Sequence, residues 1–442
     1  MLSYNVCEIK LKVSVKNYFL HQVCSRRENI DMEKVLGIIA EYNPFHNGHL
    51  HHLNLSKKIT GAEYTIAILS GNFTQRGDTS IVDKWTKAQM ALESGVDLVI
   101  ELPTLYSVSS AENFADGAIK ILDSLGIVDF ISFGSECNDI EILNDISNIL
   151  YHEPKEYRKI LSEELKTGIS YPSARQNALQ KYLENDAKYS NVLKAPNNIL
   201  GIEYLKALKK NKSDIIPITI EREAVDYSSK FVRNNIASST ALREIIQNNR
   251  LELFKKVLPT FSYNTLQDKI RDNQIVNNLS VFEKEIIYNI RKMSLDELQN
   301  IQDVSEGLEN ALKNAANSTN TLSDFINIVQ SKRYTRTRIQ RILVYILLGI
   351  TKQDMEMSKK VYPYVRILGF NINGKKLLSE ICTINPYLDV ITSVKKFTDE
   401  NKNKNLKLML EKDIFATDVY TLGYKGGSWA NLDFTHNMVL KK

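Results

Sequence analysis

The chain has 442 residues, of which 43% are hydrophobic and 25% are charged, and its net charge at pH 7 is +5. These values are typical of a soluble globular protein with two or three domains, each with its own core. The longest apolar run, residues 342–350, is too short to span a bilayer, which argues against a membrane protein. The four cysteines are far apart and have no zinc-binding spacing, so we expect reduced thiols, no metal site and a cytoplasmic protein.

The positive charge is concentrated in the second part of the chain. Residues 1–250 contain 29 Lys and Arg against 31 Asp and Glu, a net charge of −2, whereas residues 251–442 contain 28 against 21, a net charge of +7. This asymmetry indicates a polyanionic partner for the C-terminal part. A Lys-rich surface without such a partner is the alternative.

Residues 1–31 precede the first convincing strand and have the pattern of neither a secretory signal nor a transit peptide. We expect a poorly ordered extension or an over-extended gene start. Apolar runs and helical stretches then alternate. Strands are predicted at residues 35–40, 64–70, 96–102 and 128–134, with helices at 48–60, 83–94 and 111–124. A helical insertion at about 141–211 and a fifth strand at 215–220 follow.

Near-continuous apolar strands that alternate with helices predict an α/β fold, a doubly wound parallel sheet with helices on both faces. Glycines just beyond the three helices, at positions 61, 95 and 126, fit helix C-caps. We therefore expect a nucleotide-binding domain over residues 32–250. Long helical patterns dominate residues 251–442, which predict a mainly α-helical, basic domain.

The strongest chemical signal is His46-Asn47-Gly48-His49, between the first strand and the first helix. At this edge of a parallel sheet, strand and helix ends converge to form phosphate sites. Gly48 lets the backbone approach phosphates closely, and His46 and His49 can both donate to phosphate oxygens. We predict that these histidines are catalytic and stabilise charge at the α-phosphate in nucleotidyl transfer. Two surface histidines at a helix start are the alternative.

A second phosphate-binding segment is predicted at residues 236–243, which follow most of an ISxTxxR pattern. Ser239 and Thr240 can cap a helix and bind phosphate, and Arg243 follows within one turn. Ala241 stands where the pattern commonly has lysine, so part of the charge neutralisation must come from elsewhere. A plain N-cap is the alternative.

Residues 331–341 contain five cations and almost no acids nearby; the cations are Lys332, Arg333, Arg336, Arg338 and Arg341. If residues 331–350 are helical, these cations form adjacent rows on the exposed side. The stripe that would face the core consists of Ile339, Ile342, Leu343 and Ile346. With Tyr334 available to stack, the pattern predicts nucleic-acid binding. A solvated helix face is the alternative.

Taken in order and spacing, these motifs resemble those of the bacterial tRNA(Met) cytidine acetate ligase family, within the HxGH nucleotidyltransferase-like superfamily. The resembling segments are EYNPFHNGH at 41–49, SGNFTQRG at 70–77, DKW at 83–85, SGVDLVIELP at 94–103, FGSE at 133–136, APNNILG at 195–201, ASSTALR at 237–243 and SKRYTRTRIQR at 331–341. The N-terminal extension is foreign to the family pattern, and the far C-terminus is too diffuse to compare.

Members of this family use ATP and acetate to make acetyladenylate. They then transfer the acetyl group to the exocyclic amine of the wobble cytidine of elongator tRNA(Met), giving N4-acetylcytidine. The resemblance implies that ATP, with Mg²⁺ on its phosphates, lies on residues 39–52, completed by Gly134, Asn197 and Arg222. The implied segment is Ile39, Ala40, Glu41, Tyr42, Asn43, Pro44, Phe45, His46, Asn47, Gly48, His49, Leu50, His51 and His52.

Two other functions stay open at this point. A small-molecule nucleotidylyltransferase is usually one compact domain, and the basic helical extension argues against it. A non-enzymatic nucleotide-sensing or RNA-binding module would not need both histidines, Arg222 and Arg243. The sequence implies no protein partner and no membrane.

Overall fold

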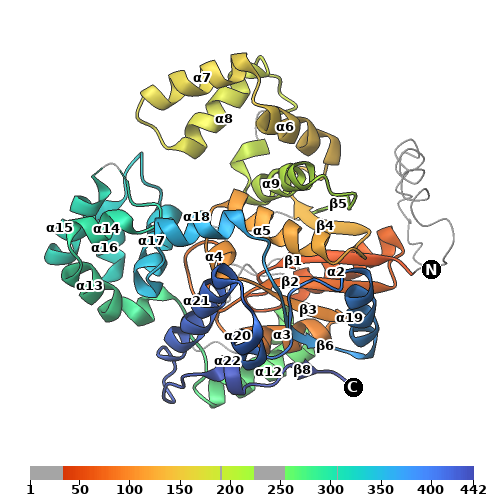
Figure 1. The fold of residues 1–442 in the computed structure, drawn as a ribbon. Helices are drawn as coiled ribbons and strands as arrows, with labels where there is room; N and C mark the ends of the chain where they lie inside the picture. Colours follow the sequence, from red (N-terminus) through yellow and green to blue (C-terminus); the bar gives the residue numbers. More distant parts are fainter. Residues whose placement is uncertain (1–32, 190–191, 223–253, 306) are drawn as a thin grey trace, which may run out of the picture.

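The computed structural model describes residues 33–189, 192–222, 254–305 and 307–442 (Figure 1). Within these ranges, eight strands form a sheet in the order β5-β4-β1-β2-β3-β6-β7, with β8 paired to β6. Strands β1 to β5 run parallel to one another, and β6 runs antiparallel to β3. Because β2 and β3 lie on one side of β1 while β4 and β5 lie on the other, the topological switch point is between β1 and β4.

The five parallel strands confirm the predicted sheet, with bounds shifted by at most two residues. They are β1 (Val35–Ala40), β2 (Tyr64–Ser70), β3 (Leu98–Leu102), β4 (Phe130–Ser135) and β5 (Ile216–Glu221). In β2, Ile66 and Ile68 belong to one apolar core, and Ala67 and Leu69 belong to a second. Alternate residues therefore face opposite layers, as expected for a sheet that is covered on both faces.

Three of the helices that follow the first strands match the prediction, and the short α4 (Thr104–Ser107) was not predicted. The three are α2 (Asn47–Thr60), α3 (Lys84–Glu93) and α5 (Ala111–Ser124). Gly61 ends α2 in the left-handed region, at φ 64°, and its N–H donates to the Lys57 carbonyl. Glycine adopts this conformation without the Cβ clash that other residues meet, so the chain turns here toward β2.

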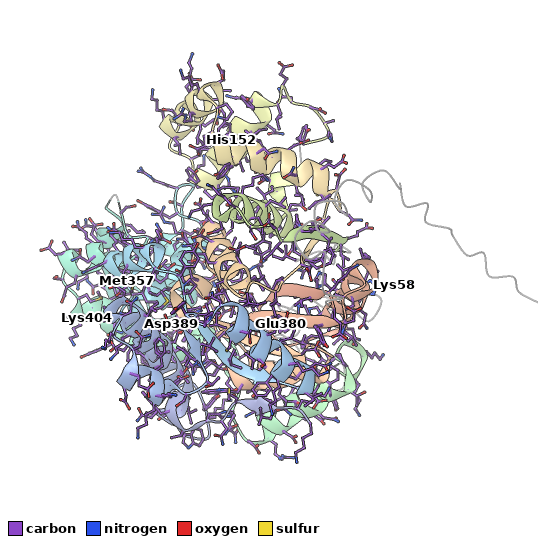
Figure 2. The ribbon with its side chains drawn as sticks, turned by 45° about the vertical axis from the view of Figure 1, so that its right-hand side comes forward. Lys58, His152, Met357, Glu380, Asp389 and Lys404 are labelled. Atoms are coloured by element: carbon purple, nitrogen blue, oxygen red, sulfur yellow. The ribbon has the colours of Figure 1, made fainter. Side chains whose placement is uncertain are left out.

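The predicted helical insertion projects from the rest of the molecule (Figures 1 and 2). It contains α6 (Ile140–His152), α7 (Lys155–Lys166), α8 (Tyr171–Tyr182), the 3₁₀ turn η1 (Val192–Lys194) and α9 (Pro196–Asn211). His152 marks the end of α6 in Figure 2. Helix α9 packs against α5 and α6 and connects the projecting helices to the sheet.

The described residues between 254 and 360 are mainly helical, as predicted. Their elements are α11 (Phe254–Val257), α12 (Thr260–Arg271), η3 (Leu279–Phe282), α13 (Glu283–Lys292), α14 (Leu295–Asn300), α15 (Leu308–Ser318), α16 (Leu322–Val329), α17 (Arg336–Leu348) and α18 (Lys352–Lys360). None of the helices in the described ranges is long and apolar enough to cross a membrane.

The last part of the chain returns to the sheet, which the sequence analysis did not predict. Its elements are β6 (Val365–Phe370), α19 (Ile372–Ile384), β7 (Val390–Ile391), α20 (Val394–Glu400), α21 (Lys404–Thr421), α22 (Leu432–Thr435) and β8 (Val439–Leu440). The sheet therefore extends beyond residue 250, and the domain division at that residue stays a prediction. Strands β7 and β8 have two residues each, too few for an alternating pattern to reveal them.

Four buried charged side chains tie this last part to the parallel strands. Lys84 Nζ lies 3.1 Å from Glu101 Oε1 and 2.6 Å from Asp433 Oδ1. The Arg366 guanidinium contacts both carboxylates, with Glu101 Oε2 at 3.1 Å. Burial opposes ionisation of Asp433, but Lys84 and Arg366 outweigh it and lower its pKa to about 2. The charges of the two cations and two carboxylates therefore neutralise one another, which offsets the cost of burying them.

Candidate functional site

The β1–α2 loop lies at the carboxyl edge of the sheet, next to the switch point. His46 is the N-cap of α2, and its backbone N–H donates to His49 Nδ1 at 3.2 Å. The two imidazole rings stack with their centroids 3.6 Å apart and their planes 19° apart. The structure thus brings together the two histidines that the sequence singled out, at a helix N-terminus that attracts anions.

Both histidines are held neutral by their surroundings. His46 is only 4% exposed, and its pKa is lowered to about 3 by burial and then by the Arg222 guanidinium. Burial also lowers the pKa of His49 well below its usual value, with further contributions from His46 and Arg222. His46 Nδ1 is buried and has no hydrogen-bond partner among the described residues. Because an unpaired buried polar atom costs about 1–3 kcal/mol, a ligand that pairs with it is favoured.

Side-chain contacts fix the shape of the β1–α2 loop. The Tyr42 ring lies 4.7 Å from the Phe45 ring and 4.9 Å from the His49 ring, centroid to centroid. Asn43 donates from Nδ2 to the Thr79 carbonyl at 3.2 Å and accepts at Oδ1 from the Ile81 N–H at 2.7 Å. These contacts hold the loop on the neighbouring β2–α3 segment.

The remaining predicted ATP-binding residues of residues 39–52 have different surroundings. Asn47 Nδ2 donates to the Lys256 carbonyl at 3.0 Å, and Glu41 Oε1 accepts from the Gln75 N–H at 2.7 Å. His52 Nε2 lies 3.2 Å from Ser132 Oγ, and its pKa is lowered to about 4, mainly by burial. The other members of the segment are Ile39, Ala40, Pro44, Gly48, Leu50 and the exposed His51.

Gly134, Asn197 and Arg222 come together on the other side of the switch point, from β4, α9 and the end of β5. Arg222 Nη1 donates to Asn197 Oδ1 at 2.8 Å. A Cβ on Gly134 would lie 3.6 Å from Arg222 Cβ, so the two residues are neighbours. Since Arg222 lowers the pKa of both His46 and His49, its charge acts on the histidine pair.

Glu136 holds Asn197 and Arg222 in place, a role that its position in the FGSE segment did not predict. Its Oε1 accepts from Asn197 Nδ2 at 2.6 Å, and its Oε2 accepts from the Asn198 N–H at 2.9 Å. The carboxylate thus caps α9 and orients the Asn197 amide whose oxygen holds Arg222. The FGSE motif, directly after an apolar strand, was the available signal. Ser239, Thr240 and Arg243 lie outside the described residues, as does the predicted N-terminal extension.

The five predicted RNA-binding cations fall into two groups. Helix α17 begins at Arg336, capped by Thr335, so the expected helix over residues 331–335 was wrong. Lys332, Arg333 and Arg336 are exposed. The core-facing stripe is confirmed, since its four members, Ile339, Ile342, Leu343 and Ile346, are all buried.

Arg338 and Arg341 do not form the exposed rows that the helical spacing predicted. Arg338 Nη2 donates to the Asp303 carbonyl at 2.7 Å and to Ser305 Oγ at 3.1 Å. The Arg341 side chain is 13% exposed, with its Nε 3.8 Å from Asp303 Oδ2. The α14–α15 connection covers this side of α17, which a single-helix argument cannot anticipate. The RNA-binding role of the cations stays a prediction.

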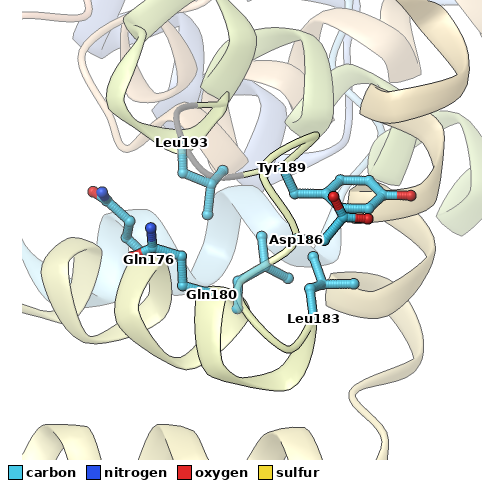
Figure 3. A pocket seen from close by; sticks show the side chains of 7 residues that line it. Gln176, Gln180, Leu183, Asp186, Tyr189 and Leu193 are labelled. Carbon is cyan, nitrogen blue, oxygen red and sulfur yellow. The ribbon is translucent and has the colours of Figure 1, made fainter.

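A small pocket elsewhere lacks the groups that a nucleotide needs. It lies between α8 and the residues Asp186, Tyr189 and Leu193, and Figure 3 shows its lining side chains. They are Gln176, Leu179, Gln180, Leu183, Asp186, Tyr189 and Leu193. The lining contains a carboxylate and no cation, which is unfavourable for phosphate binding. This pocket is therefore a poorer candidate for a nucleotide site than the switch point.

Comparison with known proteins identifies what this chain is similar to. The model of the HIGH Nucleotidyl Transferase family matches residues 32–432. The tRNA(Met) cytidine acetate ligase of Thermoanaerobacter sp. is 48% identical over 405 residues, which cover 92% of this chain and 99% of the relative. The ligase of the same name from Acetivibrio thermocellus is 44% identical over 417 residues, which cover 92% and 100%.

Solved structures agree with the sequence comparison. A crystal structure of apo Thermotoga maritima TmcAL matches with a TM-score of 0.88 and 34% identity, covering 92% of this chain and 99% of that one. A structure of the same protein bound with alpha-thio ATP matches with a TM-score of 0.85 and 35% identity, with the same coverage.

Proposed function

Because this chain belongs to the tRNA(Met) cytidine acetate ligase family, we propose that it is an ATP-dependent ligase that acetylates the wobble cytidine of elongator tRNA(Met). In the first step, an acetate oxygen attacks the α-phosphorus of ATP and pyrophosphate leaves, giving acetyladenylate. In the second step, the N4 amine of the cytidine attacks the acetyl carbon. AMP leaves, the amine loses a proton, and N4-acetylcytidine results.

The observation that carries the proposal is the stacked His46–His49 pair at the start of α2, with Arg222 across the switch point. Negative charge builds on the phosphate oxygens while pyrophosphate leaves, and donors held in place stabilise it. Neutral imidazoles donate hydrogen bonds there, and Arg222 and the N-terminus of α2 supply positive charge. Adenylation converts acetate, a poor acyl donor, into a mixed anhydride with a good leaving group.

We infer that Mg²⁺ enters with the nucleotide and is held mainly by phosphate oxygens and water. Magnesium prefers such ligands to an all-protein cage in nucleotide-dependent enzymes. Ser239, Thr240 and Arg243 are proposed to bind the phosphates at a second helix start, as the family resemblance implies.

The tRNA is proposed to bind the basic C-terminal part through its phosphates. Residues 251–442 carry the excess positive charge of the chain, and Lys332, Arg333 and Arg336 are exposed near the start of α17. A wobble base in an anticodon loop is already unpaired, so it can leave its stack and enter a pocket at low cost. Acetate and the tRNA are the two co-substrates, and no protein partner is required by this scheme.

Two assays on one purified protein test the proposal. Acetate should support exchange between ATP and pyrophosphate without tRNA, and labelled acetate should enter elongator tRNA(Met) only when ATP is present. Acetyl-coenzyme A should not replace acetate and ATP. Efficient acetylation by acetyl-coenzyme A without ATP would refute the ligase mechanism, because no adenylate would then be formed.

A further inference from the structure

The loop between β2 and α3 contacts both the proposed ATP segment and α17. On one side, the Gln75 N–H donates to Glu41 Oε1 at 2.7 Å, and Glu41 directly follows β1. On the other side, two residues later, Gly77 lies against the backbone of α17. One short stretch of chain, residues 75–77, thus spans from the edge of the ATP segment to the helix that begins at Arg336.

The contact at Gly77 is between backbones. A Cβ on this residue would lie 2.3 Å from the Arg341 nitrogen and 2.4 Å from the Gln340 carbonyl carbon. Such distances are impossible without moving α17 or the loop. Gly77 also has a φ of 74°, which residues with a side chain rarely adopt. Glycine at this position therefore permits the closest approach of the two segments.

Further hydrogen bonds dock the same loop on the helical part. Asp78 Oδ1 accepts from the Leu279 N–H at 2.7 Å, and the Val276 N–H donates to the Ile81 carbonyl at 3.0 Å. Beneath α17, Arg341 lies beside Asp303, whose carbonyl accepts from Arg338. The β2–α3 loop therefore contacts α17, and α17 in turn contacts Asp303.

We propose that residues 75–78 position α17, and the RNA held near it, relative to the adenylate. This inference rests on the proposed function. Adenylation involves only ATP and acetate at the β1–α2 loop, so it does not require α17 to be placed accurately. Acetyl transfer requires the N4 amine to reach the acetyl carbon at about 3–3.5 Å, and an error of about 1 Å can cost a hundredfold in rate. The loop is thus a positioning element for the second step.

The test compares Gly77→Ala with Gly168→Ala. Gly168 lies between α7 and α8 at a φ of 77°, and no atom of the described structure lies within 4 Å of a Cβ placed on it. Both variants carry the same left-handed strain, but only Gly77→Ala pushes against α17. Three quantities are measured: acetate-dependent ATP–pyrophosphate exchange without tRNA, tRNA affinity, and single-turnover transfer from enzyme-bound acetyladenylate to saturating tRNA.

Exchange should stay within about threefold of wild type in both variants, because neither substitution replaces a residue of the ATP segment or removes the Gln75 N–H that contacts it. Transfer should fall by about a hundredfold in Gly77→Ala and remain normal in Gly168→Ala. Asp78→Ala removes the acceptor of the Leu279 N–H without adding bulk, so it should lower transfer more than exchange even if Gly77→Ala does not fold.

Equal transfer rates in Gly77→Ala, Asp78→Ala and Gly168→Ala, with normal exchange, would overturn the positioning role alone. A parallel fall of exchange and transfer in Asp78→Ala would also overturn it, since the loop would then serve the fold as a whole. A wild-type enzyme without acetate-dependent exchange would instead overturn the proposed function.

Discussion

Acid should destabilise this protein through His46, and the substitution His46→Gln should remove that part of the acid sensitivity. In the folded chain the pKa of His46 is lowered to about 3, against an ordinary value of 6.5, because the ring is buried and Arg222 is near. Below pH 6.5 the unfolded chain binds a proton on this ring while the folded chain does not. The contribution of His46 to the free energy of unfolding is therefore fully present above the pKa of this residue in the unfolded chain. It is lost progressively as the pH falls toward about 3, the pKa of His46 in the folded chain.

The size of the effect follows from these two values. Each pH unit in that window costs about 1.4 kcal/mol for one group, so lowering the pH from about 7.5 to about 5 should cost about 2 kcal/mol through His46. His49 and His52 shift in the same direction and add to the acid sensitivity of the wild-type chain. His46→Gln keeps a hydrogen-bonding side chain of similar length but does not titrate.

The assay is urea unfolding of wild type and His46→Gln at about pH 8, 6 and 5. At about pH 8 the imidazole is neutral in both folded and unfolded chains, so the difference there measures packing alone and serves as the control. The difference in unfolding free energy between wild type and variant should then change by about 2 kcal/mol on going to about pH 5. The change should favour the variant. If the difference in unfolding free energy did not change with pH, His46 would take up a proton in the folded state. The proposal that a neutral imidazole donates to the phosphate would then be wrong.

The other predictions concern turnover, RNA binding and packing. His46→Ala or His49→Ala should lower acetate-dependent pyrophosphate formation by at least about a hundredfold, the scale for losing a fixed donor at developing charge, and near-normal turnover in both would remove the proposed site. Lys332→Ala/Arg336→Ala should leave ATP–pyrophosphate exchange intact but lower the salt slope of tRNA binding by about 1–2, whereas identical binding at every salt concentration would assign these cations to a solvated surface. Glu101→Gln should cost about 3–5 kcal/mol in unfolding free energy, because two buried cations then share a single carboxylate; a loss below about 1 kcal/mol would contradict the compensation argument.

Local patterns predicted the first half of the fold well. Each parallel strand is a continuous apolar run, and glycines beyond the helices end them, so strands and helices were found within two residues. The last strands were missed for a physical reason. Strand β6 is buried against β3, which is far away in the sequence, and its partners β7 and β8 are only two residues long. Strand pairing between segments so far apart in the sequence cannot be recognised from the pattern of apolar residues within one segment.

In the candidate site, too, local spacing predicted some features, whereas contacts between distant segments were missed. The HxGH spacing placed His46 and His49 on one side of a helix start, and the rings are found stacked. The role of Glu136 depends on α9 returning to the end of β4, with contacts between residues 61 and 62 positions apart, and spacing within one segment could not show it. Arg338 and Arg341 looked exposed for a related reason, since the Asp303 that covers them comes from another helix connection.

The C-terminal strands also bear on how the two chemical steps are combined. Because β6 pairs with β3 and Arg366 joins the buried network with Lys84, the C-terminal segment is part of the sheet whose edge carries the histidine pair. Bending at this junction would expose four buried charges and break strand hydrogen bonds, which is costly. These contacts therefore hold the C-terminal segment at a fixed place relative to the histidine pair. Under the proposed function, we therefore expect the anticodon loop of the tRNA to supply the movement that brings the cytidine to the acetyl group.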